Sequence, residues 1–152
     1  MEKPEESPPV TMVYPAQYNI LDDVRDFVER NAETYGLDST GIYAVQLAVD
    51  EAFTNIIEHA YGGECAEEIE CTCQITLNGL VIILKDCGSP FDPSEVPEPD
   101  LNSDLEDRQV GGLGLFFIRR LMDEVQYSVQ PSGFDSRDCN VIRMVKRKEK
   151  VG

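Results

Sequence analysis

Basic residues are scarce in this sequence, and tryptophan is absent. The chain has 13 Lys and Arg residues against 29 Asp and Glu residues, which gives a formal net charge of −16 at pH 7. Because such a surface repels polyanions, the composition argues against nucleic acid and against anionic membrane surfaces as partners. A partner protein with a basic surface would be favoured electrostatically.

Long apolar runs are missing too. No stretch approaches the ~18 consecutive apolar residues that indicate a membrane-spanning helix. The first ten residues, MEKPEESPPV, are acidic and proline-bearing and lack the apolar core of a secretory signal. The sequence therefore predicts a cytoplasmic protein with no membrane anchor.

Paired cysteine motifs do not occur either. The five cysteines are an odd number and show no CxxC spacing, which argues against a disulfide framework and against a structural zinc site. Cys71 and Cys73 are two residues apart in a β-rich run, so their side chains would face one side of a strand. We expect the cysteines to be reduced and packed, with no chemical role.

Hydrophobic periodicity divides the rest of the chain into helices and strands. Residues 1–9 are expected to form a loose leader and residues 148–152 a frayed tail, with a single domain over 10–147. Strands are expected over 10–15, 69–77, 80–86, 125–130 and 140–146, and helices over 20–36, 39–61 and 115–125. Hairpin-joined strands with clustered helices predict an α+β fold, a two-layer sandwich in which helices cover one face of a mixed, mostly antiparallel sheet.

A long loop and a glycine-rich turn precede the third helix. Residues 89–109 hold four prolines, seven carboxylates and few apolar groups, and a structureless loop of this length is usually functional or disordered. Gly111, Gly112, Leu113 and Gly114 follow. Such glycines let backbone N–H groups turn toward a ligand, and the positive end of a helix favours phosphate. A plain hinge at the start of a helix would show the same residues. The chain lacks the Walker A motif GxxxxGK[ST] and the dinucleotide-binding motif GxGxxG.

Polar groups lie on one face of the helix expected over 39–61. With residues placed 100° apart, Glu51, Asn55, Glu58 and His59 share one side, and apolar residues cover the opposite side. An amphipathic helix with a solvated stripe would give this pattern as well. If a nucleotide lies there, the Asn55 amide oxygen can bind Mg²⁺ and Glu51 can accept a proton from an attacking hydroxyl. We expect His59 to support the helix end and not the chemistry.

A carboxylate ends the strand expected over 80–86. Asp86 is followed one residue later by Gly88, where backbone can be approached closely. The carboxylate can accept a hydrogen bond from the exocyclic amine of adenine, whereas guanine presents an acceptor at that position. The pair would therefore select adenine nucleotides, although a turn-forming Asp and Gly would look the same.

Three segments in this order resemble the N, G1 and G2 boxes of the GHKL superfamily, the Bergerat-fold ATP-binding proteins: DEAFTNIIEHAYG, DCGSPFDP and GGLGLFFIRRLMDEV. Within that superfamily, the short chain and these segments are similar to the bacterial anti-sigma factor kinases of the RsbW type. The resemblance covers about residues 10–147. In the general motif DxGxG, this chain has Pro90 in the place of the second glycine. A proline there predicts a stiffer loop, and it resembles the anti-sigma branch of the superfamily.

The resemblance implies ATP and Mg²⁺ as cofactors and assigns roles by position. Glu51 would be the catalytic base, Asn55 the Mg²⁺ ligand and Asp86 the adenine reader. Gly88 would shape the base pocket, and the loop that follows Phe91 would be a mobile ATP lid. The phosphates would be held by Gly111, Gly112, Leu113 and Gly114.

The function implied is that of a serine/threonine kinase. Such a protein transfers the γ-phosphoryl group of ATP to a STAS-domain anti-anti-sigma protein, sequesters a sigma factor in partner-switching regulation, and can form a homodimer. Two alternatives stay open: an ATP-binding regulatory interaction module without kinase activity, and a stand-alone ATP domain of a histidine-kinase-like system. The latter is disfavoured because the only histidine, His59, lies inside the nucleotide-site helix.

Overall fold

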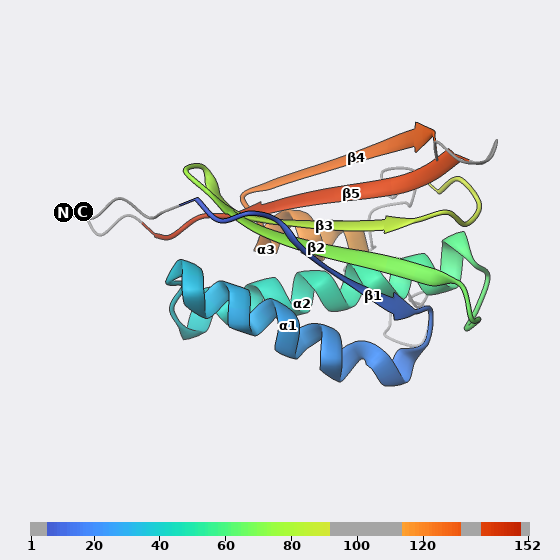
Figure 1. Cartoon of the computed structure of the whole chain (residues 1–152), viewed down its shortest axis with the longest axis horizontal. Helices are drawn as coiled ribbons and strands as arrows, with labels where there is room; N and C mark the ends of the chain where they lie inside the picture. The colour runs from blue at the N-terminus through green and yellow to red at the C-terminus, as the bar shows by residue number, and fades with distance from the viewer. Residues whose placement is uncertain (1–5, 92–113, 132–137, 150–152) are drawn as a thin grey trace, which may run out of the picture.

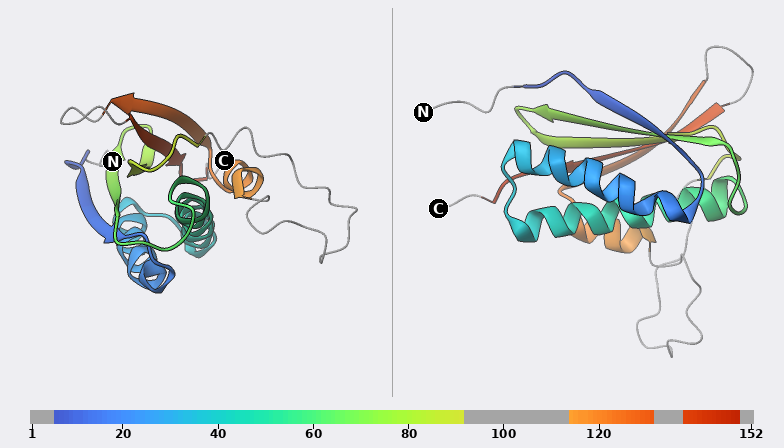
Figure 2. Two further views of the ribbon diagram at one scale, coloured as in Figure 1. Left: turned by 90° about the vertical axis from the view of Figure 1, so that its right-hand side faces the viewer. Right: turned by 60° about the horizontal axis from the view of Figure 1, so that its bottom comes forward.

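The computed structural model describes residues 6–91, 114–131 and 138–149. Within these ranges five strands form one sheet, and three α-helices lie together on one of its faces (Figures 1 and 2). The strands are β1 (Val10–Pro15), β2 (Glu68–Thr76), β3 (Gly79–Asp86), β4 (Glu124–Pro131) and β5 (Asp138–Lys146). The helices are α1 (Leu21–Tyr35), α2 (Ser39–Asn55) and α3 (Gly114–Leu121), with a 3₁₀ turn η1 (Tyr18–Ile20) and a π-helical turn η2 (Ile56–Ala60).

The sheet has the order β1-β2-β3-β5-β4, and each of these pairings is antiparallel. The predicted α+β two-layer sandwich is therefore confirmed, with no parallel pair between the strands described. Burial alternates along β2, where Cys71 and Cys73 face the core as predicted. The central strand β3 is buried along almost its whole length, because neighbours flank it on both edges and helices cover one face.

The helix ends follow from local signals. α1 ends at Gly36, which takes a φ of 105°, a conformation that favours glycine. α2 begins after Asp38, whose side chain accepts a 2.8 Å hydrogen bond from the Gly41 N–H. The predicted helix over 39–61 is found, but its last turn is the π-helical η2. In the described ranges, no helix combines the length and the apolarity that crossing a bilayer demands.

The third helix is shorter than its periodicity predicts. It ends at Leu121 instead of continuing to residue 125, and β4 begins at Glu124. Between them the Asp123 N–H donates to the Val145 carbonyl at 2.8 Å, and Lys146 Nζ donates to the Leu121 carbonyl at 2.9 Å. Hydrogen bonds to β5 thus end the helix before its apolar periodicity does. The periodicity of a local segment does not show which distant strand it will meet.

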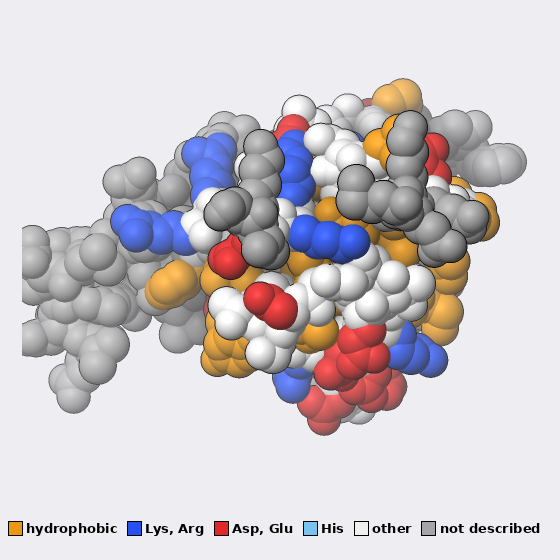
Figure 3. All heavy atoms as spheres, turned by 90° about the vertical axis from the view of Figure 1, so that its left-hand side faces the viewer, with side chains coloured by type: hydrophobic (Ala, Val, Ile, Leu, Met, Phe, Trp, Pro, Cys, Tyr) orange, Lys and Arg blue, Asp and Glu red, His pale blue; other side chains and the backbone are white. Residues whose placement is uncertain are grey.

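The β2–β3 hairpin forms where Asn78 and Gly79 predict it. Gly79 has a φ of 139°, and a Cβ there would lie 2.7 Å from the Lys146 carbonyl oxygen, so a larger residue is excluded. Figure 3 views this end of the molecule, where basic and acidic side chains share the surface. Arg147 donates to Asn78 and pairs with Glu124 there. These contacts attach the end of β5 to the hairpin.

The expectation that the cysteines are all reduced is wrong for two of them. Cys87 and Cys139 form a disulfide, while Cys65, Cys71 and Cys73 are free. The β3–β5 register explains the pair: Asp86 stands opposite Asn140, and because the strands are antiparallel, Cys87 after Asp86 comes opposite Cys139 before Asn140. A separation of 52 residues carries no such signal in the sequence.

Candidate functional site

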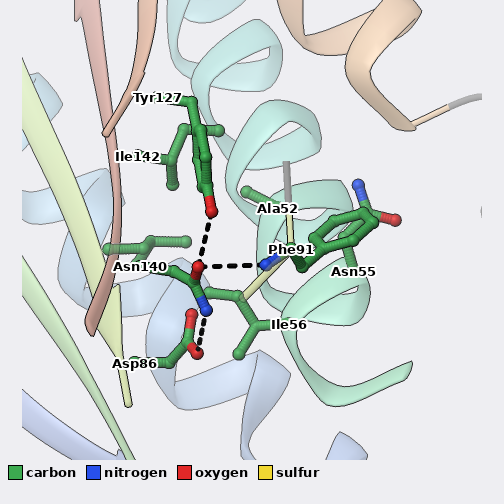
Figure 4. Close-up of a pocket in the computed structure, with 9 residues that line it drawn as sticks. Ala52, Asn55, Ile56, Asp86, Phe91, Tyr127, Asn140 and Ile142 are labelled. Atoms are coloured by element: carbon green, nitrogen blue, oxygen red, sulfur yellow. Dashed lines mark hydrogen bonds between the residues drawn. The ribbon is translucent and has the colours of Figure 1, made fainter. Parts of the chain in front are cut away.

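A small cavity lies where α2, the end of β3 and the start of β5 meet (Figure 4). Its volume is about 20 Å³, little more than one water molecule occupies. Figure 4 shows Asp86 and Asn140 on one side of it, and Asn55 and Phe91 on the other. The lining is completed by Ala52, Ile56, Leu84, Tyr127 and Ile142.

Asp86 is a buried carboxylate in this wall, only 2% exposed. Its Oδ1 accepts hydrogen bonds of 3.0 Å from Asn140 Nδ2 and of 3.0 Å from the Gly88 N–H. Burial raises the pKa of the Asp86 carboxyl, while the hydrogen bonds from Asn140 and Gly88 act in the opposite direction. A carboxylate fixed in this way presents an acceptor of constant orientation to the cavity.

Asn140 holds the carboxylate in place and was not singled out from the sequence. Besides Asp86, its Nδ2 donates to the Ser89 carbonyl at 2.9 Å. Its Oδ1 accepts from the Phe91 N–H at 3.1 Å and from the Tyr127 hydroxyl at 2.5 Å. The amide thus makes two bonds through each of its polar atoms, and ties Asp86 to the loop that follows β3. The one sequence signal was an asparagine at the head of an apolar strand.

Gly88 lies where the loop after β3 crosses η2. A Cβ at this position would lie 2.6 Å from the Ala60 carbonyl oxygen, and the Ser89 N–H donates to that same oxygen at 2.8 Å. The close approach to the backbone that the sequence predicts at Gly88 therefore exists, but the group that approaches is the backbone of η2. Gly88 shapes the site by letting this loop pack directly on the π-helical turn.

Asn55 lines the cavity and carries an unsatisfied polar atom. The residue is 4% exposed, and its Oδ1 is buried with no hydrogen-bond partner among the described residues. Leaving a buried acceptor unpaired costs about 1–3 kcal/mol. Such an oxygen suits a hard cation, since amide oxygens are among the ligands that Mg²⁺ accepts. The donor chemistry at Asn55 therefore fits the metal that the sequence predicts.

Glu51 lies one turn before Asn55 on α2, and is not part of the cavity lining. Burial raises the pKa of the half-buried Glu51 carboxyl, and the neighbouring Asp50 and Glu58 raise it further. Asp50 points elsewhere, because its Oδ1 accepts a 3.0 Å bond from Arg25 Nε. A carboxyl with a raised pKa is closer to the range in which a general base works near neutral pH.

His59 and Phe91 form a ring stack beside the cavity. The ring centroids are 4.7 Å apart with planes 14° from parallel. His59 is exposed and comes from η2, whereas Phe91 is the last described residue before the long loop. The histidine thus stacks on the aromatic ring that lines the cavity, and its support of the helix end stays a prediction.

The glycine-rich turn is only partly described. Gly114 is the first residue of α3, which packs beside α2, whereas Gly111, Gly112, Leu113 and the predicted lid lie outside the described residues. The structure thus brings Asn55 and Asp86 together around one cavity, with Gly88 beside it bonded to Asp86, and puts Glu51 on the adjoining turn. The roles of these residues stay predictions.

Comparisons with known proteins agree with the sequence resemblance. Residues 14–146 match the model of the histidine kinase-like ATPase domain. A serine-protein kinase RsbW of Listeria monocytogenes is 33% identical over 121 residues, which are 77% of each chain. A serine-protein kinase RsbW of Halalkalibacterium halodurans is 32% identical over 123 residues, 77% of this chain and 74% of the relative.

Solved structures show the same fold at low identity. The RsbU and RsbW domains of a Mycobacterium tuberculosis protein superpose with a TM-score of 0.62 at 17% identity, over 93% of this chain and 32% of that chain. A SiaB–SiaC complex from Pseudomonas aeruginosa gives a TM-score of 0.60 at 14% identity, over 90% of this chain and 88% of the other. At these identities the likeness concerns the fold alone.

Proposed function

Because the chain belongs to the family of histidine kinase-like ATPase domains, we propose that it binds ATP at the Asp86 cavity and phosphorylates a serine or threonine of a partner protein. The observation that carries this proposal is the buried carboxylate of Asp86, held by Asn140 in the wall of a cavity that Asn55, a residue with an unsatisfied buried oxygen, also lines. The serine-protein kinases among its relatives support the reaction type.

The base of the nucleotide would meet Asp86. A carboxylate oxygen accepts a hydrogen bond from the exocyclic amine of adenine, whereas the oxygen that guanine carries there would face a second acceptor, with no proton between them. Adenine would be preferred for that reason, as sites built to bond a donor reject analogues that lack it. Asn140 would contribute by keeping the carboxylate oriented.

The phosphates would extend from the base toward Asn55 and the start of α3. The Asn55 oxygen would hold Mg²⁺, and the ion would supply positive charge to the phosphate oxygens. Backbone N–H groups at Gly114 and the three residues before it would face the phosphates at the positive end of the helix. Glu51, one turn from Asn55, would take the proton from the attacking hydroxyl.

We further propose a STAS-domain anti-anti-sigma protein as the phosphoryl acceptor and a sigma factor as the sequestered partner. The resemblance of the sequence to the RsbW-type anti-sigma factor kinases suggests these partners, and the net charge of −16 suits basic protein surfaces. Partner switching in the cytoplasm and a homodimer belong to the same proposal. An ATP-binding module without kinase activity is the alternative that the experiment must separate.

The test is transfer of labelled γ-phosphate to STAS proteins encoded beside this chain. Wild-type protein with Mg²⁺ should label one of them on serine or threonine, and Glu51→Gln should lose labelling while it still binds the nucleotide and the STAS protein. Glu33→Gln, on the surface of α1, is the matched control. Binding of ATP and of the STAS protein without any labelling would contradict kinase activity and favour the regulatory module.

A further inference from the structure

The Cys87–Cys139 disulfide lies next to the pair of residues that forms the cavity wall. Cys87 follows Asp86 at the end of β3, and Cys139 precedes Asn140 at the start of β5. We propose that Cys87 and Cys139 are a reversible dithiol–disulfide site that controls the entry of the nucleotide into the Asp86 cavity. The proposal rests on the proposed function of that cavity.

The disulfide anchors the loop that places Phe91 at the cavity. Residues 87–91 are also held by hydrogen bonds along their length, among them the following three from backbone N–H groups. The Cys87 N–H donates to the Tyr61 hydroxyl at 3.3 Å, and the Ser89 N–H donates to the Ala60 carbonyl at 2.8 Å. The Phe91 N–H donates to Asn140 Oδ1 at 3.1 Å. With the covalent link at its first residue, this loop has little freedom to move away from β5.

The cavity of the disulfide-bonded chain is too small for a purine. About 20 Å³ is available beside Asp86, with the Phe91 ring lining it and stacking on His59 at 4.7 Å. A purine base is far larger than the single water that such a space accommodates. Entry of the base therefore requires the Phe91 ring to leave the cavity, which an outward shift of its loop would achieve. The oxidised chain resists that shift more than the reduced chain does.

Reduction would begin at Cys87. Cys139 is fully buried, whereas Cys87 is partly exposed and lines a second, open hollow with Tyr61, Glu67 and Asp138. A thiolate of a dithiol reductant would attack Cys87 Sγ, and the sulfur–sulfur bond would break with Cys139 leaving as a thiolate that takes up a proton.

The second thiol of the reductant completes the exchange. Its thiolate attacks the mixed disulfide, releases the Cys87 thiolate, which takes up a proton, and leaves the reductant as a disulfide. Two electrons pass from the reductant to the cysteine pair. A disulfide oxidant reverses the reaction. Disulfides of proteins in reducing compartments are usually transient, catalytic or redox-sensing, which fits reversible use in the cytoplasm.

Nucleotide affinity in the two redox states tests the proposal. A fluorescent ATP analogue with Mg²⁺ would be titrated into oxidised wild type, into wild type reduced with a phosphine, and into the double variant Cys87→Ser, Cys139→Ser. If the loop is open about one-tenth of the time in the oxidised chain and nearly all the time in the reduced chain, the Kd of the oxidised chain is about tenfold higher. Alkylation and mass spectrometry should show that reduction frees Cys87 and Cys139.

The variants separate this pair from the other cysteines. The double serine variant should bind as the reduced wild type does under both conditions, and Cys65→Ser, which removes a free and partly buried cysteine, should keep the wild-type response. Equal affinity in both states, tighter binding by the oxidised chain, or a redox response in the double variant would each overturn the proposal. Reduced wild type provides the comparison even if the double variant does not fold. Equal binding in both states leaves the proposed function standing, whereas no binding in either state overturns both.

Discussion

Asn140 Nδ2 donates a 3.0 Å hydrogen bond to Asp86 Oδ1, and the two residues stand opposite each other in the β3–β5 ladder. Both side chains are buried, at 5% and 2% exposure. The amide is saturated by its four bonds, so it holds the carboxylate, the Ser89 carbonyl and the Phe91 N–H in one arrangement. The wall of the cavity is thus a single hydrogen-bonded unit.

Replacing Asn140 with alanine should disrupt that unit. The free energy of unfolding is expected to fall by roughly 1–3 kcal/mol, because buried polar groups lose their partners. ATP affinity should fall as well, since the Asp86 carboxylate is no longer oriented. Urea unfolding and nucleotide titration measure the two effects. Asn31→Ala, which removes an amide bonded to the Phe27 carbonyl on α1, is the control. Full stability and full affinity in Asn140→Ala would contradict the role given to the amide.

A methyl group at Gly88 should destabilise the fold through a backbone clash. The added Cβ would lie 2.6 Å from the Ala60 carbonyl oxygen, and overpacking of this kind costs about 1–3 kcal/mol. For a chain of this size each kcal/mol lowers Tm by about 2–4 °C. Thermal unfolding of Gly88→Ala measures the loss. Ser89→Ala, at the exposed neighbouring position, should leave Tm nearly unchanged; a Gly88→Ala variant as stable as this control would show that the loop is not tightly packed on η2.

Asn55→Leu should separate stability from function. The substitution removes the buried oxygen that has no partner among the described residues, and replacing an unpaired polar group with an apolar one of similar shape is nearly neutral or stabilising. We expect equal or higher Tm together with loss of the Mg²⁺-dependent part of ATP binding. Calorimetric titration with and without Mg²⁺, beside thermal unfolding, tests both. A variant that keeps the Mg²⁺ dependence would exclude Asn55 as the ligand.

The buried Asp86 carboxyl should leave a signature in the pH dependence of stability. Burial raises the pKa of Asp86 above its ordinary value, so between the two values the folded chain binds more protons than the unfolded chain. The free energy of unfolding therefore falls as pH rises through this window. The asparagine side chain of the Asp86→Asn variant cannot ionise. The stability of this variant relative to wild type should therefore rise with pH over the same range.

Urea unfolding at a series of pH values from acid to neutral measures that difference. Asp22→Asn, at an exposed position on α1, controls for the removal of one negative charge from an acidic chain. A relative stability of Asp86→Asn that is constant, or that falls with rising pH, would show that the Asp86 carboxyl is not disfavoured in its charged form by the fold.

Local signals were sufficient for most of the elements. Asp38 and Gly36 mark helix ends because capping and positive φ depend on neighbouring residues only, and Asn78-Gly79 marks the hairpin for the same reason. The limits that were wrong lie where a distant strand intervenes. The third helix stops early because Asp123 pairs with Val145, a residue 22 positions later that periodicity does not represent.

The sequence by itself determined the family, the order of the elements and three of the residues that meet at the site, Asn55, Asp86 and Gly88. All three kinds of prediction depend on short segments of neighbouring residues, which can be read without knowing how the rest of the chain packs. The tertiary structure alone decided that Asn140 bonds to Asp86, that Cys87 bonds to Cys139, and that Phe91 lies against the cavity. Each of the two pairs joins residues more than fifty positions apart, and their contact depends on the register of β3 on β5, which the packing of the whole sheet sets.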